Sequence, residues 1–377
     1  MKQFNFFKSK YAALVLGCAA LFFSCSKDNN DDPILAPEVG MTVDTQAVEM
    51  TMGETLNFEA INLNDAVYSS AWTIGDSLVS SVGTYEFMPE TSGEYELTYR
   101  ASNDAGEFVF DYNISVAALI RPTTPDSKAY VTDLFEFLPA PGQFINKSPG
   151  NLESAEGVLN GKNGLVSLGA WGGSITLGFD HTVLNSENEK DFIVYGNALP
   201  TFSEPGIIWV MQDENANGLA DDTWYEIKGS GHDLEDTKRN YSVTYFKPAT
   251  ADDDVAWEDS EGNTGAVVKN MFHSQAYYPE WITAESYTLT GTMLPDTNID
   301  MSNPSWITSA AYDYGYGDNT TGGDEIDIAD AIDAEGNSVS LQGIDFIKIQ
   351  TGVQADMGWL GELSTEVSGI ADLSLLN

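Results

Sequence analysis

Between about residues 36 and 118, apolar and polar positions alternate in short runs, as they do in half-buried β-strands. The runs are rich in β-branched and aromatic residues, and glycines separate them. They cover residues 55–61, 67–74, 85–89, 95–102 and 108–116. Regular short strands over this length predict an antiparallel β-sandwich domain at 36–118. Trp72 lies on one of these strands, where such sandwiches often bury an aromatic side chain.

The segment ALIRPTTPDSKAY (118–130) interrupts this pattern with two prolines and predicts a linker at 119–129. Beyond it, residues 130–377 are rich in glycine, asparagine, aspartate and aromatic residues, and they contain further strand-like runs without a long helical period. These runs cover residues 165–169, 173–179, 191–197, 206–212, 223–229, 241–247, 286–291 and 344–352. A glycine-punctuated region of this kind predicts one jelly-roll-like β-sandwich domain, so the expected fold class is all-β throughout.

The first residues have the pattern of a secretory signal peptide. Three lysines precede an apolar stretch at 11–23, which is shorter than the roughly 20 residues that a membrane-spanning helix needs. Ser24-Cys25 resembles a bacterial lipobox, and the acidic run after Cys25 resembles the surface-export signal of Bacteroidetes lipoproteins. We therefore expect a signal peptide at 1–24, a lipidated Cys25, a flexible acidic tether at 25–35 and a cell-surface location on the outer membrane. The alternative is an ordinary signal peptide with an incidental cysteine.

The charge of the chain restricts its partners. Loss of three lysines with the signal peptide would leave 13 of the 16 basic residues against 58 acidic ones, a formal charge of −45. Such a surface repels nucleic acid and anionic membranes, so we expect no nucleic-acid partner and membrane contact only through the lipid. Cys18 would leave with the signal peptide and Cys25 would carry the lipid, so the mature chain would have no disulfide and no cysteine nucleophile.

An acidic loop, QDENANGLADDTWYE (212–226), is the candidate metal site of the sequence. Its spacing matches an EF-hand-type calcium loop through Gly218, but Trp224 stands where the bidentate glutamate belongs. The candidate ligands are Asp213, Asn215, Asn217, the backbone of Leu219, Asp221 and Asp222. The loop joins two expected strands, so the sequence predicts a structural calcium site of modest affinity, with Trp224 packed inward. The alternative is an acidic hairpin turn without an ion.

Aromatic residues beside glycine, proline or asparagine are the candidates for a ligand site. Such loop residues offer a large, rigid contact area at a low entropic cost. The candidate ligand-binding residues are Trp171, Tyr277, Tyr278, Trp281, Tyr312, Tyr314 and Tyr316. The alternative is that these side chains pack into the core.

Motifs of catalysis are missing from the sequence. It contains no G-x-S-x-G and no H-E-x-x-H, and its three histidines stand far apart. Carboxylates are so numerous that a glycosidase pair cannot be identified among them. We therefore expect no enzyme, and a glycosidase is the less favoured alternative.

Several long runs resemble a family of Bacteroidetes surface lipoproteins in which an immunoglobulin-like module precedes a jelly-roll-like domain. Residues 92–106 resemble the late strands of PKD and related immunoglobulin-like modules, with Tyr95 in the place of their corner tyrosine. The other runs are residues 172–180, 191–199, 204–230, 239–248, 277–282, 312–319 and 358–373. The resemblance implies a surface protein that binds vitamin B12 (cobalamin), as a ligand rather than a cofactor, and passes it to an outer-membrane TonB-dependent transporter. A glycan-binding protein that uses the same aromatic residues is the alternative.

Overall fold

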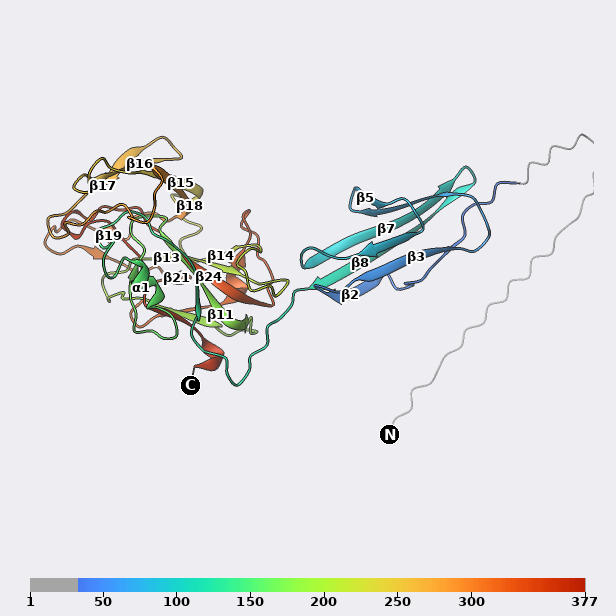
Figure 1. Cartoon of the computed structure of the whole chain (residues 1–377), viewed down its shortest axis with the longest axis horizontal. Helices are drawn as coiled ribbons and strands as arrows, with labels where there is room; N and C mark the ends of the chain where they lie inside the picture. Colours follow the sequence, from blue (N-terminus) through green and yellow to red (C-terminus); the bar gives the residue numbers. More distant parts are fainter. Residues whose placement is uncertain (1–32, 377) are drawn as a thin grey trace, which may run out of the picture.

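The computed structural model describes residues 33–376 and contains two β-sheet domains (Figure 1). The predicted all-β fold class is confirmed, because strands are the main regular structure of the described residues, and their sheets are antiparallel apart from one parallel strand pair. The predicted signal peptide, Cys25 and most of the acidic tether lie outside the described residues. Among the described residues, none of the helices has the length and apolar character needed to cross a membrane.

The smaller domain is a sandwich of two sheets. The three-stranded sheet has the order β1–β3–β6 and consists of β1 (Val39–Met41), β3 (Leu56–Asn62) and β6 (Thr84–Phe87). The five-stranded sheet has the order β2–β8–β7–β4–β5 and consists of β2 (Ala47–Thr51), β8 (Gly106–Ala117), β7 (Gly93–Asn103), β4 (Ser69–Ile74) and β5 (Ser77–Ser80). All five strands expected from the sequence are present, together with β1, β2 and β5.

Two aromatic residues give this sandwich an immunoglobulin-like character. Trp72 on β4 is fully buried between the sheets, where its ring lies 4.7 Å from that of Tyr99. Tyr95, near the start of β7, donates a hydrogen bond from its hydroxyl back to the carbonyl of Thr91 at 2.7 Å. A buried tryptophan on a central strand and such a tyrosine corner are features of immunoglobulin-like domains.

The larger domain is built around a sheet with the order β23–β14–β13–β24–β11–β9, to which β21 (Tyr316–Gly317) adds beside β13. The six strands are β23 (Ala331–Ile332), β14 (Tyr225–Ile227), β13 (Gly206–Met211), β24 (Gly343–Thr351), β11 (Ser174–Leu184) and β9 (Asp133–Leu138). A second sheet consists of β22 (Asp324–Ile326), β12 (Phe192–Tyr195) and β26 (Gly369–Asp372). Alternate residues of the first sheet, such as Ile208 and Ile347, pack with Phe192 of the second sheet and form the main core.

A third sheet covers part of the other face of the large sheet. It consists of β17 (Thr264–Val267), β16 (Val255–Asp259), β15 (Lys238–Phe246) and β18 (Ser286–Met293), in that order. Tyr245 of β15 packs in a second core with Trp171, and Gln350 of β24 donates to the carbonyl of Thr290 on β18. The sequence predicted β15 and β18 but not the hairpin of β16 and β17.

The remaining elements are short. They are the pairs β10 (Val166–Ser167) with β25 (Glu366–Val367) and β19 (Ile299–Asp300) with β20 (Thr308–Ser309), the α-helix α1 (Leu152–Glu156), and the 3-10 helices η1 (Ile328–Asp330), η2 (Gly358–Leu360) and η3 (Leu373–Leu375). The segment predicted as a linker has no helix or strand, but its Arg121 binds the larger domain. The guanidinium donates to Asp345 at 3.0 Å and to the carbonyl of Phe179 at 3.2 Å.

Candidate functional site

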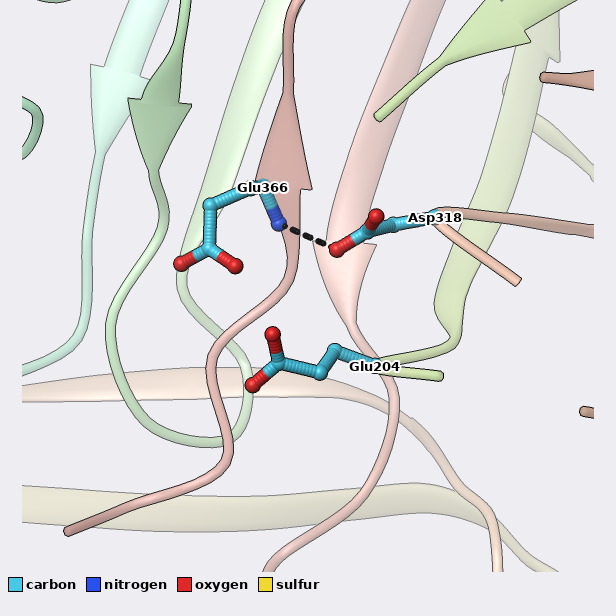
Figure 2. A group of neighbouring side chains, drawn as sticks. All are labelled: Glu204, Asp318 and Glu366. Atoms are coloured by element: carbon cyan, nitrogen blue, oxygen red, sulfur yellow. Dashed lines mark hydrogen bonds between the residues drawn. The ribbon is translucent and has the colours of Figure 1, made fainter. Parts of the chain in front are cut away.

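A cluster of three acidic side chains lies inside the larger domain, where segments distant in sequence meet (Figure 2). Glu204 precedes β13, Asp318 follows β21, and Glu366 lies on β25. One carboxylate oxygen of each residue lies within 4.8 Å of the corresponding oxygens of the other two. Asp318 and Glu366 are almost completely buried, whereas Glu204 is partly exposed. We call these three residues the carboxylate cluster.

Backbone hydrogen bonds hold the cluster in place. Asp318 accepts from the N–H groups of Asn197 and Glu366 at 2.8 and 2.9 Å, and it therefore joins the segment after β12 to β25 through one side chain. Glu204 accepts from the N–H of Ser364 at 3.3 Å. A side chain on Gly196 would collide with the Asp318 carboxylate, since an added Cβ would lie 2.3 Å from Oδ1. The glycine therefore permits this approach.

The charge of the cluster has no cationic partner within it. Burial, followed by repulsion from Glu366, raises the pKa of both Glu204 and Asp318 well above their usual range. Burial also raises the pKa of Glu366, and one of its carboxylate oxygens has no hydrogen-bond partner in the described structure. Several buried carboxylates at this separation require protons or a cation to balance their charge. The three side chains could therefore hold a metal ion.

A cavity of about 230 Å³ lies beside the cluster and is lined by both Glu204 and Glu366. Its other walls include apolar residues such as Phe144 and Leu360. Glu362 lines this cavity and also a second one of about 120 Å³, whose walls include Trp171. Burial raises the pKa of Glu362 to about 8. The arrangement places acidic groups at the base of a recess with partly apolar walls.

Three loops expose large apolar side chains, and one of them, residues 357–360, contributes Met357 and Leu360 to the wall of this recess. They are residues 268–273, 301–306 and 357–360, which we call the loop face. The exposed residues are Val268, Met271, Phe272, Met301, Trp306 and Trp359, with 89% of Met271 and 67% of Trp306 accessible to solvent.

Hydrogen bonds connect the three loops of the loop face. Gln143 donates to the carbonyl of Leu360 and accepts from Asn270, both at 2.6 Å. Trp359 donates from its indole N–H to the carbonyl of Pro304 at 2.7 Å. The exposed side chains therefore belong to adjoining segments rather than to isolated positions.

The structure separates most of the aromatic residues predicted to bind a ligand. Trp171, Tyr277 and Tyr278 are buried in the core beneath the third sheet, and Tyr316 is buried beside β13. Trp281 and Tyr312 are partly buried, and of the seven only Tyr314 is exposed. The idea that loop positions make these residues a common surface is therefore wrong, and the alternative of core packing holds for the four buried ones. A role for Trp171 in ligand binding stays a prediction, because it lines the smaller cavity.

The acidic loop lies between β13 and β14, as predicted, and its side chains bind its own backbone. Asp213 is fully buried and accepts from the N–H groups of Asn217 and Gly218 at 2.9 and 2.8 Å. Asn217 in turn accepts from the N–H of Leu219 at 2.7 Å. These contacts fit a hairpin turn and also a calcium loop, whose occupation stays a prediction. Trp224 is not packed inward as expected, because it lines an open groove.

The loop also contacts the smaller domain. Glu214 accepts from the backbone N–H of Ser92 through its carboxylate and from that of Leu119 through its carbonyl. This contact could not be predicted from the sequence, because Ser92 and Glu214 are far apart along the chain.

Reasoning from the sequence missed the carboxylate cluster. Its members belong to three separate segments in a chain with 58 acidic residues, so composition could not single them out. One sequence feature could have pointed to Asp318. Glycines stand on both sides of Tyr316, immediately before Asp318, and glycines often mark places where backbone and side chains approach closely.

Comparisons with known proteins identify no family. No family model matches the chain, and no curated protein matches it. Similar solved structures include fibronectin(III)-like modules of Clostridium thermocellum CbhA, with 14% identity over 61% of this chain and 91% of that one and a TM-score of 0.21. Others are a chimeric titin Z1Z2, with 13% identity over 70% and 98% and a TM-score of 0.20, and a quinonprotein alcohol dehydrogenase-like protein from Bacteroides thetaiotaomicron, with 11% identity over 62% of both chains and a TM-score of 0.21. At such TM-scores these likenesses carry no argument, so the fold and the site rest on the geometry of this chain.

Proposed function

We propose that this protein is a non-catalytic lipoprotein of the outer-membrane surface that captures cobalamin or a related corrinoid at the loop face. In this proposal it passes the ligand to a TonB-dependent transporter. The observation that supports it is the exposure of Phe272, Trp306 and Trp359 on loops that hydrogen bonds join together. Large apolar side chains exposed side by side usually mark a binding surface.

The size of the proposed ligand supports this choice of surface. A corrinoid is a broad, nearly flat macrocycle with amide groups around its edge, and the two cavities beside Glu362, at about 120 and 230 Å³, are too small to enclose it. The indole rings of Trp306 and Trp359 would cover the face of the macrocycle. Polar groups of the surrounding loops would meet its amides. This proposal replaces the seven aromatic residues expected from the sequence with a different set.

Calcium is the cation that we propose for this protein. Calcium prefers oxygen ligands, and both the carboxylate cluster and the acidic loop offer carboxylate oxygens. Extracellular calcium sites work at affinities of about 10⁻⁴–10⁻³ M, which a site with few charged ligands can reach. Its role would be structural, because the acidic loop connects two strands and the carboxylate cluster joins three separate segments of the larger domain.

Co-elution tests the proposed ligand. The full mature chain is mixed with cyanocobalamin and passed through a gel-filtration column, and the coloured ligand is followed with the protein. We expect co-elution for the wild type and for Phe246→Ala, which removes an exposed aromatic side chain of β15 outside the loop face. Co-elution should be lost when Trp306→Ala and Trp359→Ala are combined. Elution of the wild type without colour would contradict the proposal.

A further inference from the structure

A groove of about 420 Å³ crosses the uncovered part of the large sheet, away from the carboxylate cluster. Its lining includes Glu136, Thr176, Trp224 and Lys348, and Leu219 and Asp221 of the acidic loop form one wall. Its volume falls within the range of about 300–1,000 Å³ that is usual for ligand sites. We propose that this groove binds a neutral carbohydrate, as a second site beyond the proposed corrinoid surface.

Strand register assembles the floor of the groove. Glu136 on β9 pairs with Thr176 on β11, Thr176 pairs with Lys348 on β24, and Lys348 pairs with Trp209 on β13. Directly paired residues of antiparallel strands point to the same face of the sheet. Four strands therefore present one row of side chains, and the strands themselves are held rigidly by the core on their other face.

Two indoles fix the lysine within this row. The Lys348 ammonium lies 4.9 Å from the ring centre of Trp209 and 5.1 Å from that of Trp224. Burial lowers the pKa of Lys348, with Glu136 and Glu226 opposing that effect. In the described part of the chain, the ammonium forms no hydrogen bond and no salt bridge to protein. A half-buried ammonium with three unused donors is suited to a ligand that supplies oxygen acceptors.

The side chains that line the groove favour a sugar over other classes of ligand. Sugars have an apolar C–H face, which a tryptophan ring can cover, and hydroxyl groups that both donate and accept hydrogen bonds. Lys348 can donate to these hydroxyls, Glu136 can accept from them, and the Thr176 hydroxyl can do both. One ammonium stands with two carboxylates, those of Glu136 and Asp221, so an anionic ligand would meet net repulsion. A neutral carbohydrate satisfies all of these groups.

Affinity electrophoresis tests the proposal. The full mature chain is run in native gels that contain galactomannan, xyloglucan, pullulan or arabinan, with polygalacturonate as an anionic comparison. We expect at least one neutral polysaccharide to retard the wild type. Trp224→Ala and Lys348→Met should weaken that retardation at least tenfold, whereas Trp224→Phe should keep part of it and Phe246→Ala should keep all of it.

Several outcomes would overturn the groove as a neutral-sugar site. They are no retardation in any neutral gel, retardation by polygalacturonate alone, or undiminished retardation of Trp224→Ala. Melting temperatures near that of the wild type establish that the variants are folded. Co-elution with cyanocobalamin, measured on the same samples, distinguishes the two proposals. Sugar binding without corrinoid binding would support the groove as a sugar site and contradict the proposed function. Loss of corrinoid binding in Trp224→Ala would show that the groove is not a separate site.

Discussion

Replacement of Glu362 by glutamine probes how the fold tolerates buried negative charge. One oxygen of the Glu362 carboxylate accepts from the backbone N–H of Gln143 at 2.7 Å, and the other has no partner in the described structure. Burial raises the pKa of this carboxyl to about 8, and Glu366 and Asp356 add to the increase. Glutamine has nearly the same shape and can accept the same hydrogen bond, but it does not titrate.

The magnitude follows from the two pKa values. The pKa of Glu362 is 4.5 in its ordinary state and about 8 in the folded state. At 1.36 kcal/mol per pKa unit, this difference corresponds to about 5 kcal/mol in the free energy of unfolding. Between these values the folded state keeps a proton that the unfolded state has lost. The contribution to stability is therefore complete below about pH 4.5 and is lost as the pH rises through about 8. From pH 5 to pH 8, the wild type should lose about 3.5 kcal/mol relative to Glu362→Gln.

Urea unfolding across this pH range, with a chelator present, measures the effect. Tryptophan fluorescence reports mainly on the larger domain, because seven of the eight tryptophans follow residue 130. Glu187→Gln, which makes the same change at an exposed carboxylate, provides the matched control. A difference between Glu362→Gln and the wild type that stays constant from pH 5 to pH 8 would refute the reasoning.

The remaining predictions concern the acidic loop, the linker and the smaller domain. A chelator should lower the melting temperature of the wild type but not that of Asp213→Asn, which removes the charge of this side chain and keeps an acceptor for one of the two backbone N–H groups that it binds. No change in the wild type would identify a turn without calcium. Arg121→Ala should cost about 3 kcal/mol in urea unfolding, because buried Asp345 loses its cation, and a cost near zero would count against that ion pair. Tyr95→Phe should lower the free energy of unfolding of the smaller domain by about 1 kcal/mol, as measured by hydrogen exchange of its backbone amides. Exchange rates equal to those of the wild type would show that the tyrosine corner does not contribute.

The strands could be predicted because side-chain alternation is a local property. The run at 344–352 corresponds to β24, and the run at 206–212 corresponds to β13, within one residue at each end. The hairpin of β16 and β17 was missed because its strands are only five and four residues long, too short to show a clear alternation. In the structure β16 pairs with the edge of β15, a contact between segments that a local pattern does not show.

The ligand site could not be predicted in the same way. Glycines beside aromatic residues predict exposed loops, but in the structure they permit close packing instead. An added Cβ on Gly229 would lie 2.4 Å from the Tyr316 ring, and one on Gly172 would lie 2.8 Å from Leu289, near buried Trp171. The same sequence pattern therefore fits a ring held in the core and a ring offered to a ligand, and only tertiary structure distinguishes them.

Calorimetric titration of the mature protein with cyanocobalamin tests the central claim most directly. We expect saturable one-to-one binding for the wild type, with at least tenfold weaker binding for Trp359→Ala and unchanged binding for Phe246→Ala. The loss should be larger for the double variant with Trp306→Ala, since both indoles belong to the loop face. Absence of binding by the folded wild type, or binding that both tryptophan substitutions leave unchanged, would contradict the claim that this surface captures a corrinoid.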